Sequence, residues 1–263
     1  MTEPASHPLE DLRARLAALR GEVRSAVVTG FDGDDVIVRF DDGPDDASGR
    51  VPSHELSWHR TGHPSELHAV GQRITGEVTG ADGQGRVLLS AKACEDEPLR
   101  RFLLGMEPGS VVTGTVSSVH PFGVFVRIDG EPPHPVYPGT GFLRVPELSW
   151  SRFEHPADVV APGQRITAKV LVADTRRGQV ALSLKALQED PWDRLEGCAG
   201  AVVSGPVTEV LPFGAFVRVG EGAEGFVHVD DLGGRTVSGG QDMRVRIVEI
   251  DRPRRRIRLA PAD

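Results

Sequence analysis

The chain has 263 residues, of which 39% are hydrophobic and 26% charged, a composition typical of a folded protein and not of a disordered one. No apolar run exceeds four residues, which excludes a membrane-spanning helix, and the N-terminus lacks the pattern of a signal peptide. Its two cysteines, Cys94 and Cys198, are too few for a disulfide framework or a structural zinc site. We therefore expect a cytoplasmic protein.

The net charge of −8 is concentrated at the beginning of the chain. Residues 1–98 carry 18 acidic and 10 basic side chains, residues 99–191 carry 9 and 10, and residues 192–263 carry 11 and 10. Negative charge repels the phosphates of nucleic acid, so only the first of these three parts argues against nucleic-acid binding. Basic surfaces can form on the other two.

The first predicted element is a helix within residues 1–20. Leu9, Leu12, Leu16 and Leu19 form an apolar stripe at helical spacing. We expect this helix to pack on the domain that follows it, and docking on a partner is the alternative.

Three copies of one sequence pattern follow the helix. The segments ELSW at 55–58 and GQRIT at 71–75 both recur 92 residues later, at 147–150 and 163–167. The second and third copies share the segments PFGVFVR at 121–127 and PFGAFVR at 212–218. A repeat of this kind indicates three similar domains in tandem.

Each copy is predicted to form five strands, and five short strands within about 75 residues are typical of a small barrel. The expected strands are 22–31, 35–40, 49–51, 73–79 and 86–90 in the first copy, 111–119, 123–128, 141–145, 165–173 and 179–183 in the second, and 201–210, 215–219, 224–229, 243–250 and 256–259 in the third. The predicted domains are residues 21–94, 108–187 and 198–260, joined by short helical linkers.

The alternation of faces along a strand predicts which side chains point outward. In residues 214–219, Phe216 and Arg218 share one face, and small apolar side chains share the other. Burying an unpaired arginine costs far more than exposing a phenylalanine, so we expect Phe216 and Arg218 on the outside. The same pattern places Phe125 and Arg127 outside in the second copy.

The predicted outer face combines aromatic rings with cations, and single-stranded nucleic acid binds such surfaces by stacking its bases and neutralising its phosphates. For Phe122 and Phe213, the alternative is that they plug the end of a barrel. The candidate RNA-binding residues are Phe122, Phe125, Arg127, Phe142, Arg144, Phe213, Phe216, Arg218, Phe226 and His228.

The first copy lacks this aromatic face. Its residues at the positions of Phe122, Gly123, Phe125 and Arg144 are, in that order, Asp34, Asp35, Ile37 and Pro52. Carboxylates repel phosphate, so we predict that the first barrel has lost RNA binding.

Seven arginines fall within 15 residues near the end of the third copy, from Arg244 to Arg258. Strand alternation places Arg256 and Arg258 together on the outer face, so both join the candidate set. The alternative is an edge strand that its charges protect from aggregation.

These motifs together resemble the S-one domain, an RNA-binding OB-fold repeat named after the largest ribosomal protein of the bacterial small subunit. In the second copy the resemblance rests on ELSW at 147–150, His155 with Pro156, LSLK at 182–185 and EDPW at 189–192. It implies an all-β chain of three tandem five-stranded OB barrels. It also adds Asp251 to the candidate set and places Phe213, Phe216, His228 and Arg256 at the family's usual binding positions.

The chain departs from the family pattern at several positions. In the second copy, Arg144 replaces the usual histidine and Gln179 replaces an arginine. A proline-rich insert at 131–138 has no assigned role. The third copy lacks the ELSW segment.

The resemblance implies a non-catalytic protein that binds single-stranded RNA, in particular mRNA, during translation. The small ribosomal subunit would be a partner through the N-terminal helix and the acidic first barrel. The chain has no P-loop, no GxSxG, no dinucleotide-binding fingerprint and no zinc-ligand spacing, so we expect no catalytic centre and no metal. We also expect a monomer with no cofactor and no membrane contact. The alternatives are a protein-interaction module and an RNA chaperone or regulator of RNA processing that acts off the ribosome.

Overall fold

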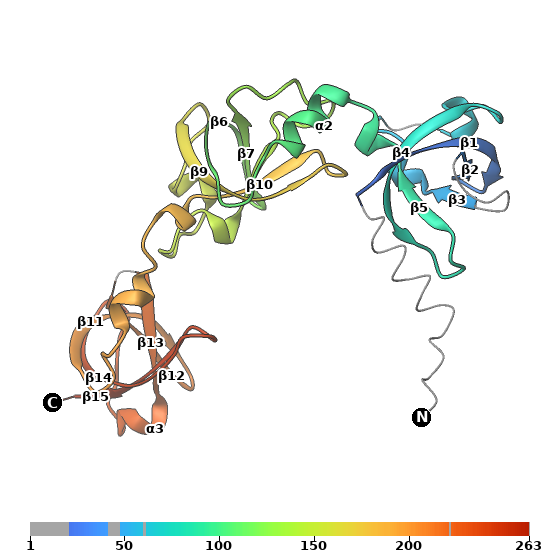
Figure 1. Ribbon diagram of the computed structural model, residues 1–263. Coiled ribbons are helices and arrows are strands. Elements are labelled where there is room, and N and C mark those ends of the chain that lie inside the picture. Colours follow the sequence, from blue (N-terminus) through green and yellow to red (C-terminus); the bar gives the residue numbers. More distant parts are fainter. Residues whose placement is uncertain (1–20, 42–47, 60–61, 221, 263) are drawn as a thin grey trace, which may run out of the picture. The chain divides into compact units, whose positions relative to one another are not determined.

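The computed structural model describes residues 21–41, 48–59, 62–220 and 222–262. These residues form three closed five-stranded β-barrels in tandem (Figure 1), which confirms the all-β prediction. The predicted helix within residues 1–20 lies outside the described residues. Among the helices that the structure describes, none has the length and apolar character needed to cross a membrane.

The strands lie within a few residues of the predicted ranges. The first barrel contains β1 (Val23–Asp32), β2 (Asp35–Phe40), β3 (Ser48–Val51), β4 (Arg73–Ala81) and β5 (Val87–Ser90). The second contains β6 (Val111–His120), β7 (Gly123–Ile128), β8 (Gly141–Arg144), β9 (Arg165–Asp174) and β10 (Gln179–Ser183). The third contains β11 (Val202–Leu211), β12 (Gly214–Gly220), β13 (Ala223–His228), β14 (Asp242–Asp251) and β15 (Arg256–Pro261).

Short helices connect the strands and the barrels. Within the described residues, the α-helices are α2 (Glu97–Leu104), which precedes the second barrel, and α3 (Val229–Leu232) in the third. The 3₁₀ helices are η1 (Ser53–Glu55), η2 (Pro64–Glu66), η3 (Lys92–Cys94), η4 (Val145–Glu147), η5 (Pro156–Asp158), η6 (Lys185–Leu187) and η7 (Pro191–Leu195).

A long, bent first strand closes the first and third barrels. In the first barrel, β1 pairs with both β2 and β4, and β3 runs parallel to β5. The register of β1 against β2 shifts between Val28 and Gly30, and the register of β11 against β12 shifts between Val207 and Glu209. A bulge of this kind bends a strand, which lets one strand take part in both halves of a small barrel.

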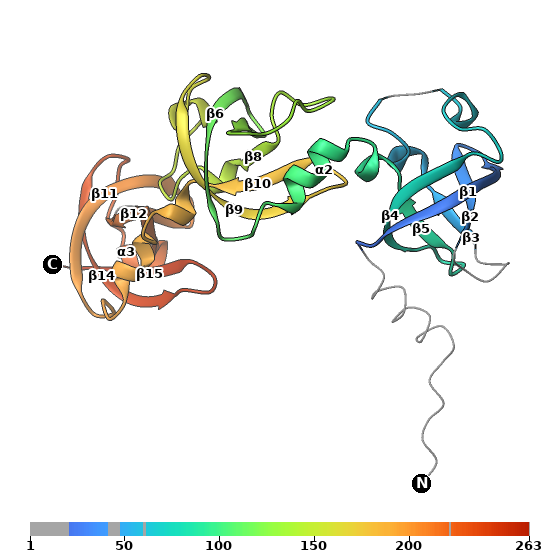
Figure 2. The ribbon, with the colours of Figure 1, turned by 45° about the horizontal axis from the view of Figure 1, so that its top comes forward.

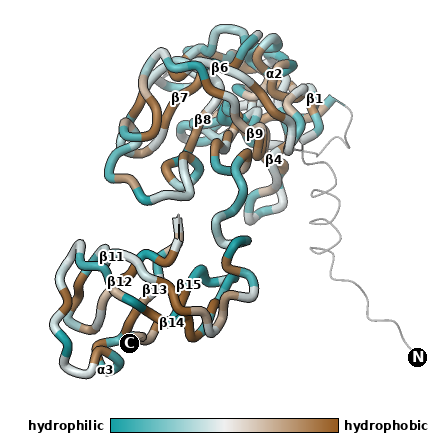
Figure 3. Tube along the Cα trace, turned by 90° about the vertical axis from the view of Figure 1, so that its left-hand side faces the viewer, coloured by the Kyte–Doolittle hydropathy of each residue, from teal (hydrophilic) through white to brown (hydrophobic). Residues whose placement is uncertain are grey.

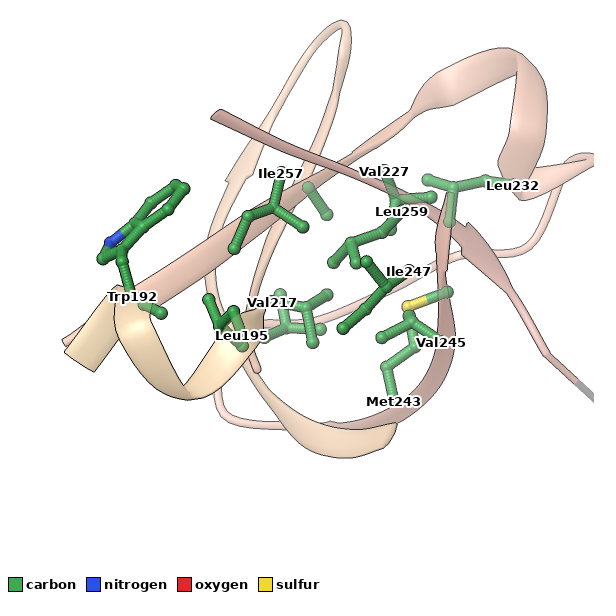
Figure 4. Close-up of a cluster of buried hydrophobic side chains, with 13 residues drawn as sticks. Trp192, Leu195, Val217, Val227, Leu232, Met243, Val245, Ile247, Ile257 and Leu259 are labelled. Atoms are coloured by element: carbon green, nitrogen blue, oxygen red, sulfur yellow. The ribbon is translucent and has the colours of Figure 1, made fainter. Parts of the chain in front are cut away.

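The interior of the third barrel is aliphatic. Ala215, Val217 and Val227 are fully buried, and they alternate along β12 and β13 with side chains that point out of the barrel. Hydrophobic and hydrophilic segments accordingly both occur along the strands (Figure 3). The core cluster is completed by side chains of β14 and β15, among them Ile247 and Leu259 (Figure 4).

The linker before the third barrel is part of that barrel's core. Trp192 and Leu195 of η7 are buried, and in Figure 4 they lie beside the side chains of the strands. Asp190 caps η7 by accepting a hydrogen bond from the Trp192 backbone N–H at 3.0 Å. This segment, predicted as a short helical linker, is therefore anchored to the barrel that follows it.

The linker before the second barrel is a capped amphipathic helix. Asp96 accepts a hydrogen bond from the Leu99 N–H at 2.8 Å, and Leu99 and Leu103 are buried. Helix α2 lies beside β9 in two views (Figures 1 and 2). Its Arg100 is also buried and forms an ion pair with Glu77 of β4.

We expect Trp192→Ala to destabilise the third barrel by about 3–5 kcal/mol, because the indole is only 5% exposed and its removal leaves a cavity in the core. Chemical denaturation, followed by NMR signals of the third barrel, measures this loss. Leu187→Ala is the matched control in the same linker, because Leu187 is 43% exposed. A loss no larger than that of the control would show that η7 is not part of the core.

Candidate nucleic-acid interface

Phenylalanine rings cluster on the outside of the third barrel. Phe216 of β12 lies directly opposite Phe226 of β13 in the register, and their ring centroids are 5.1 Å apart. Phe213 lies 5.7 Å from Phe226, and the ring of His228 lies 6.3 Å from it. Phe213 is 54% exposed, which contradicts the alternative that it plugs the end of the barrel. The predicted residues of this barrel are therefore brought together around Phe226.

A glycine makes room for this cluster. Gly214 has a φ of 155°, and a Cβ atom there would overlap the Val227 carbonyl oxygen and lie 2.5 Å from the Phe226 ring. Any other residue would push the Phe226 ring out of place. The glycine of the PFG segment is thus a requirement of the ring cluster as well as of the backbone.

Arginines of β15 border the same rings. Phe213, Phe216 and Phe226 line a groove together with Arg256 and Arg258. Both arginines are exposed while Ile257 is buried, as strand alternation predicts.

The two arginines of β15 differ in their partners. The Nε atom of Arg258 lies 3.7 Å from the Glu249 carboxylate. Among the described residues, Arg256 and Arg218 have neither an ion pair nor a side-chain hydrogen bond. The groove therefore combines stacking surfaces with at least one uncompensated cation.

The arginine cluster at 244–258 is less basic than its sequence indicates. Arg252 forms ion pairs with Asp193 and Glu196, and Arg255 forms one with Asp190. These acids belong to the linker, about 60 residues earlier in the chain, so the sequence run alone does not reveal the pairing.

Asp251, a predicted binding residue, caps its own turn. Its carboxylate accepts hydrogen bonds from the Arg254 backbone N–H at 3.1 Å and from the Arg254 guanidinium at 3.2 Å. Its side chain is thereby committed within the β14–β15 turn.

Phe125 in the second barrel was expected to be exposed, and the structure corrects this. The side chain is only 8% exposed. Tyr137, from the proline-rich insert, stacks on the Phe125 ring at 5.5 Å with an interplanar angle of 20°, and Phe142 lies 5.1 Å away. The strand alternation is as predicted, since Val124 and Val126 on either side are buried, but the insert covers the outer face at this point.

The other predicted residues of the second barrel are more accessible. Phe122 is 63% exposed, so it does not plug the barrel, and it stacks on His120 at 5.0 Å. Arg127 and Arg144 are exposed, and the Arg127 guanidinium lies 4.0 Å from the Glu131 carboxylate. His120 was not predicted from the sequence, although a histidine two residues before Phe122 could have indicated the stacking.

Two partly buried acceptors hold the insert at 131–138 in place. Glu131 accepts hydrogen bonds from the backbone N–H groups of Ile128 and Thr140 at 3.0 and 2.9 Å. The Nδ1 atom of His134 accepts hydrogen bonds from the backbone N–H groups of Val136 and Tyr137, both at 3.0 Å. Burial lowers the pKa of His134 below its ordinary value, although the charge of Asp96 opposes this shift.

The first barrel carries an ion pair where the third carries phenylalanine rings. Ile37 and Arg50 are register partners on β2 and β3, as Phe216 and Phe226 are on β12 and β13. The Arg50 guanidinium pairs with Asp35, which also accepts a hydrogen bond from the Ser53 N–H at 2.8 Å. The predicted carboxylate surface is therefore partly neutralised, but no aromatic ring replaces the missing ones at these two positions.

The profile of the S1 RNA binding domain, the S-one domain named above, matches residues 20–92, 106–185 and 198–260. The small ribosomal subunit protein bS1 of Mycobacterium tuberculosis is 38% identical over 205 residues, which cover 73% of this chain and 41% of that protein. A 4-hydroxy-3-methylbut-2-enyl diphosphate reductase of Clostridium acetobutylicum is 34% identical over 164 residues, covering 59% of this chain and 24% of that protein.

The chain spans about two fifths of the length of the mycobacterial relative. Among solved structures, GSP13 from Bacillus subtilis is 29% identical with a TM-score of 0.28, and the similarity covers 32% of this chain and 60% of that one.

We expect the insert to open as the pH falls from about 7.5 to 5, because protonation of Nδ1 removes both hydrogen bonds that His134 accepts. The pKa of His134 is lowered in the closed form, so the open form binds the proton more readily. The closed form keeps its full stability above the ordinary pKa of about 6.5 and loses it as the pH falls below that value.

Amide hydrogen exchange of Val136 and Tyr137 measures this opening. His134→Asn is the control, because its side-chain oxygen can accept the same bonds without titrating in this range. Equal pH dependence in both proteins would contradict the role of His134.

Proposed function

Since the chain belongs to the S1 RNA-binding domain family, we propose that it is a non-catalytic protein that binds single-stranded RNA in translation. The observation that carries this proposal is the groove on the third barrel, where three phenylalanine rings lie beside the unpaired Arg256. Bases stack on such rings whatever their sequence, and arginine neutralises the phosphates between them. If the wild-type protein does not retain labelled oligouridylate on a filter, the proposal is refuted.

The candidate RNA-binding residues are unequally accessible in the second and third barrels. The third barrel supplies Phe213, Phe216, Phe226, His228 and the cations of β15. In the second barrel Phe122 is open, whereas Tyr137 covers Phe125. We propose that RNA binds mainly to the third barrel and to the open part of the second.

The first barrel has a different role in this proposal. Its ion pair between Arg50 and Asp35 and its exposed Asp34 offer neither stacking nor net positive charge. We propose that this barrel contacts protein, with the small ribosomal subunit as the partner, and that mRNA is the RNA ligand. In the same proposal the protein is a cytoplasmic monomer. Co-sedimentation with small subunits in a sucrose gradient tests the ribosomal part.

Two other functions predict different results. A protein-interaction module would retain no oligonucleotide on a filter. An RNA chaperone or regulator of RNA processing acting off the ribosome would bind RNA but not co-sediment. The bS1 relatives favour the ribosomal alternative over both.

We expect Phe216→Ala to weaken RNA binding by about 1–3 kcal/mol and to leave the melting temperature nearly unchanged, because the ring lies outside the barrel core. Phe125→Ala is the matched comparison on the equivalent strand of the second barrel. It should lower the melting temperature, because its ring is covered by Tyr137 and Phe142. Titration with oligouridylate and thermal unfolding measure the two effects. Unchanged RNA affinity in Phe216→Ala would remove the third barrel's rings from the site.

We expect Arg256→Gln to reduce the slope of log K against log salt by about 1, because each cation that contacts a phosphate releases roughly one counterion. Arg254→Gln is the control from the preceding turn, since that guanidinium is already bound to Asp251. Affinity is measured at several salt concentrations. Equal slopes in wild type and Arg256→Gln would show that Arg256 does not contact phosphate.

A further inference from the structure

Arg255 has an unusual backbone conformation. Its φ of 49° makes it the one non-glycine residue with positive φ among the residues that the structure describes. The equivalent residues in the turns before the last strands of the other two barrels are glycines: Gly178, directly before β10, has a φ of 62°, and Gly85, two residues before β5, has a φ of 81°. An arginine is strained where glycine is relaxed, and such strain persists only where other contacts hold it.

The side chain of Arg255 connects three segments. Its guanidinium forms an ion pair with Asp190 of the linker and lies 4.3 Å from the ring centre of Trp150 and 5.6 Å from that of Trp192. Trp150 is the tryptophan of the repeated ELSW segment. Lys185 of the LSLK segment lies 4.5 Å from the same ring, and its carbonyl accepts the indole N–H at 3.1 Å. Two cations thus contact one tryptophan.

The preceding junction uses the same parts. Trp58, the tryptophan of the first ELSW segment, lies 5.6 Å from the Lys92 ammonium. A Cβ atom on Gly178, in the β9–β10 turn, would lie 2.9 Å from the Trp58 ring. In each junction, therefore, the ELSW tryptophan of one repeat meets the last turn of the next.

The β9–β10 turn is also held by buried carboxylates. Arg176 binds Glu55, and Thr175 donates a hydrogen bond to Glu77 at 2.9 Å. Burial acts to raise the pKa of the Glu55 carboxyl, but the hydrogen bonds from Arg176 and Ser90 and the charge of Lys92 hold it below its ordinary value. Glu55 therefore stays charged and paired.

We propose that the repeated ELSW segment is a docking surface for the last turn of the following barrel. We also propose that Arg255 is the positioning residue that stabilises the second of these junctions. The contacts of Arg255 with Asp190 and Trp150 are called the lock below. The occupant in both junctions is the following barrel of the same chain, whose last turn carries Arg255 in the third barrel and Gly178 next to Arg177 in the second. The strained φ of Arg255 is retained because its guanidinium binds Asp190 and Trp150 at once.

The lock also shapes the surface beside the candidate RNA groove. A second groove is lined by Trp150, Arg152, Phe216, Arg218 and Arg255, and it shares Phe216 and Arg255 with the groove of the phenylalanines. Arg152 lies 3.5 Å from Glu209 and 4.0 Å from Glu224 at this place. Under the proposed function, on which this step rests, a long RNA bound at Phe216 continues into this second groove, whereas a short RNA does not need it.

Asp190→Asn in the full chain tests the lock. Asparagine can keep the cap on the Trp192 N–H but not the charge that holds Arg255. Oligouridylates of about 5 and about 20 nucleotides are the probes, since one OB barrel covers about 4–16 nucleotides. We expect the dissociation constant for the long probe to rise roughly tenfold, because the two grooves no longer bind one RNA as linked sites. The dissociation constant for the short probe should stay within about twofold of the wild-type value.

Proteolysis within residues 187–197 supplies a readout that needs no RNA. Asp190→Asn should speed cleavage there, Arg255→Gly should do the same, and the double variant should be cleaved no faster than either one. Arg254→Gly is the control in the same turn, and it should match wild type because Arg254 pairs with Asp251 alone.

Two outcomes overturn the lock: cleavage of Asp190→Asn at the wild-type rate, or an unchanged ratio of long-probe to short-probe affinity. If the wild-type protein binds neither probe, the proposed function fails. The cleavage rates still decide whether Arg255 stabilises the junction.

Discussion

The small bore of a five-stranded barrel determines where this protein can place its large side chains. The interior admits one side chain from every second position, and in the third barrel these are Ala215, Val217, Val227 and other aliphatic residues. Phenylalanines on the intervening positions must then lie outside. Exposed rings would normally be a liability, but in register on β12 and β13 they pack against one another and form a stacking surface. The candidate interface of the third barrel is thus a consequence of closing the barrel.

The fold and the faces of its strands were predictable because both are local properties of the sequence. Alternation along 214–219 placed Val217 inside and Arg218 outside, and the structure agrees. Phe125 shows the limit of this reasoning. The same alternation sends its ring outward, but the covering side chain, Tyr137, lies in an insert without strand periodicity. Nothing in the local pattern indicates that a loop folds back over a strand twelve residues earlier.

Charge was harder to predict than shape, because ion pairs form between residues that are distant in the sequence. In the sequence, Arg252 and Arg255 belong to one basic run. Their ion-pair partners, Asp193 and Asp190, lie in the preceding linker. In the first barrel, Arg50 occupies the register position of Phe226 and neutralises Asp35. From the sequence alone, Asp35 was expected to be an unpaired carboxylate. Counting charges along a segment therefore overestimates both its basic and its acidic surfaces.

The position that opens the last strand shows how one fold yields three different surfaces. In the first barrel the equivalent residue is Arg86, directly before β5, and it is held by Asp82 at 2.7 Å, so its charge is already satisfied. In the second barrel the residue is the neutral Gln179, and in the third it is Arg256, which has no partner among the described residues. An arginine binds phosphate strongly only if it gives up little elsewhere, because breaking an existing ion pair offsets the gain. Availability of the cation, more than its presence in the sequence, is therefore the reason why the proposed function assigns RNA mainly to the third barrel.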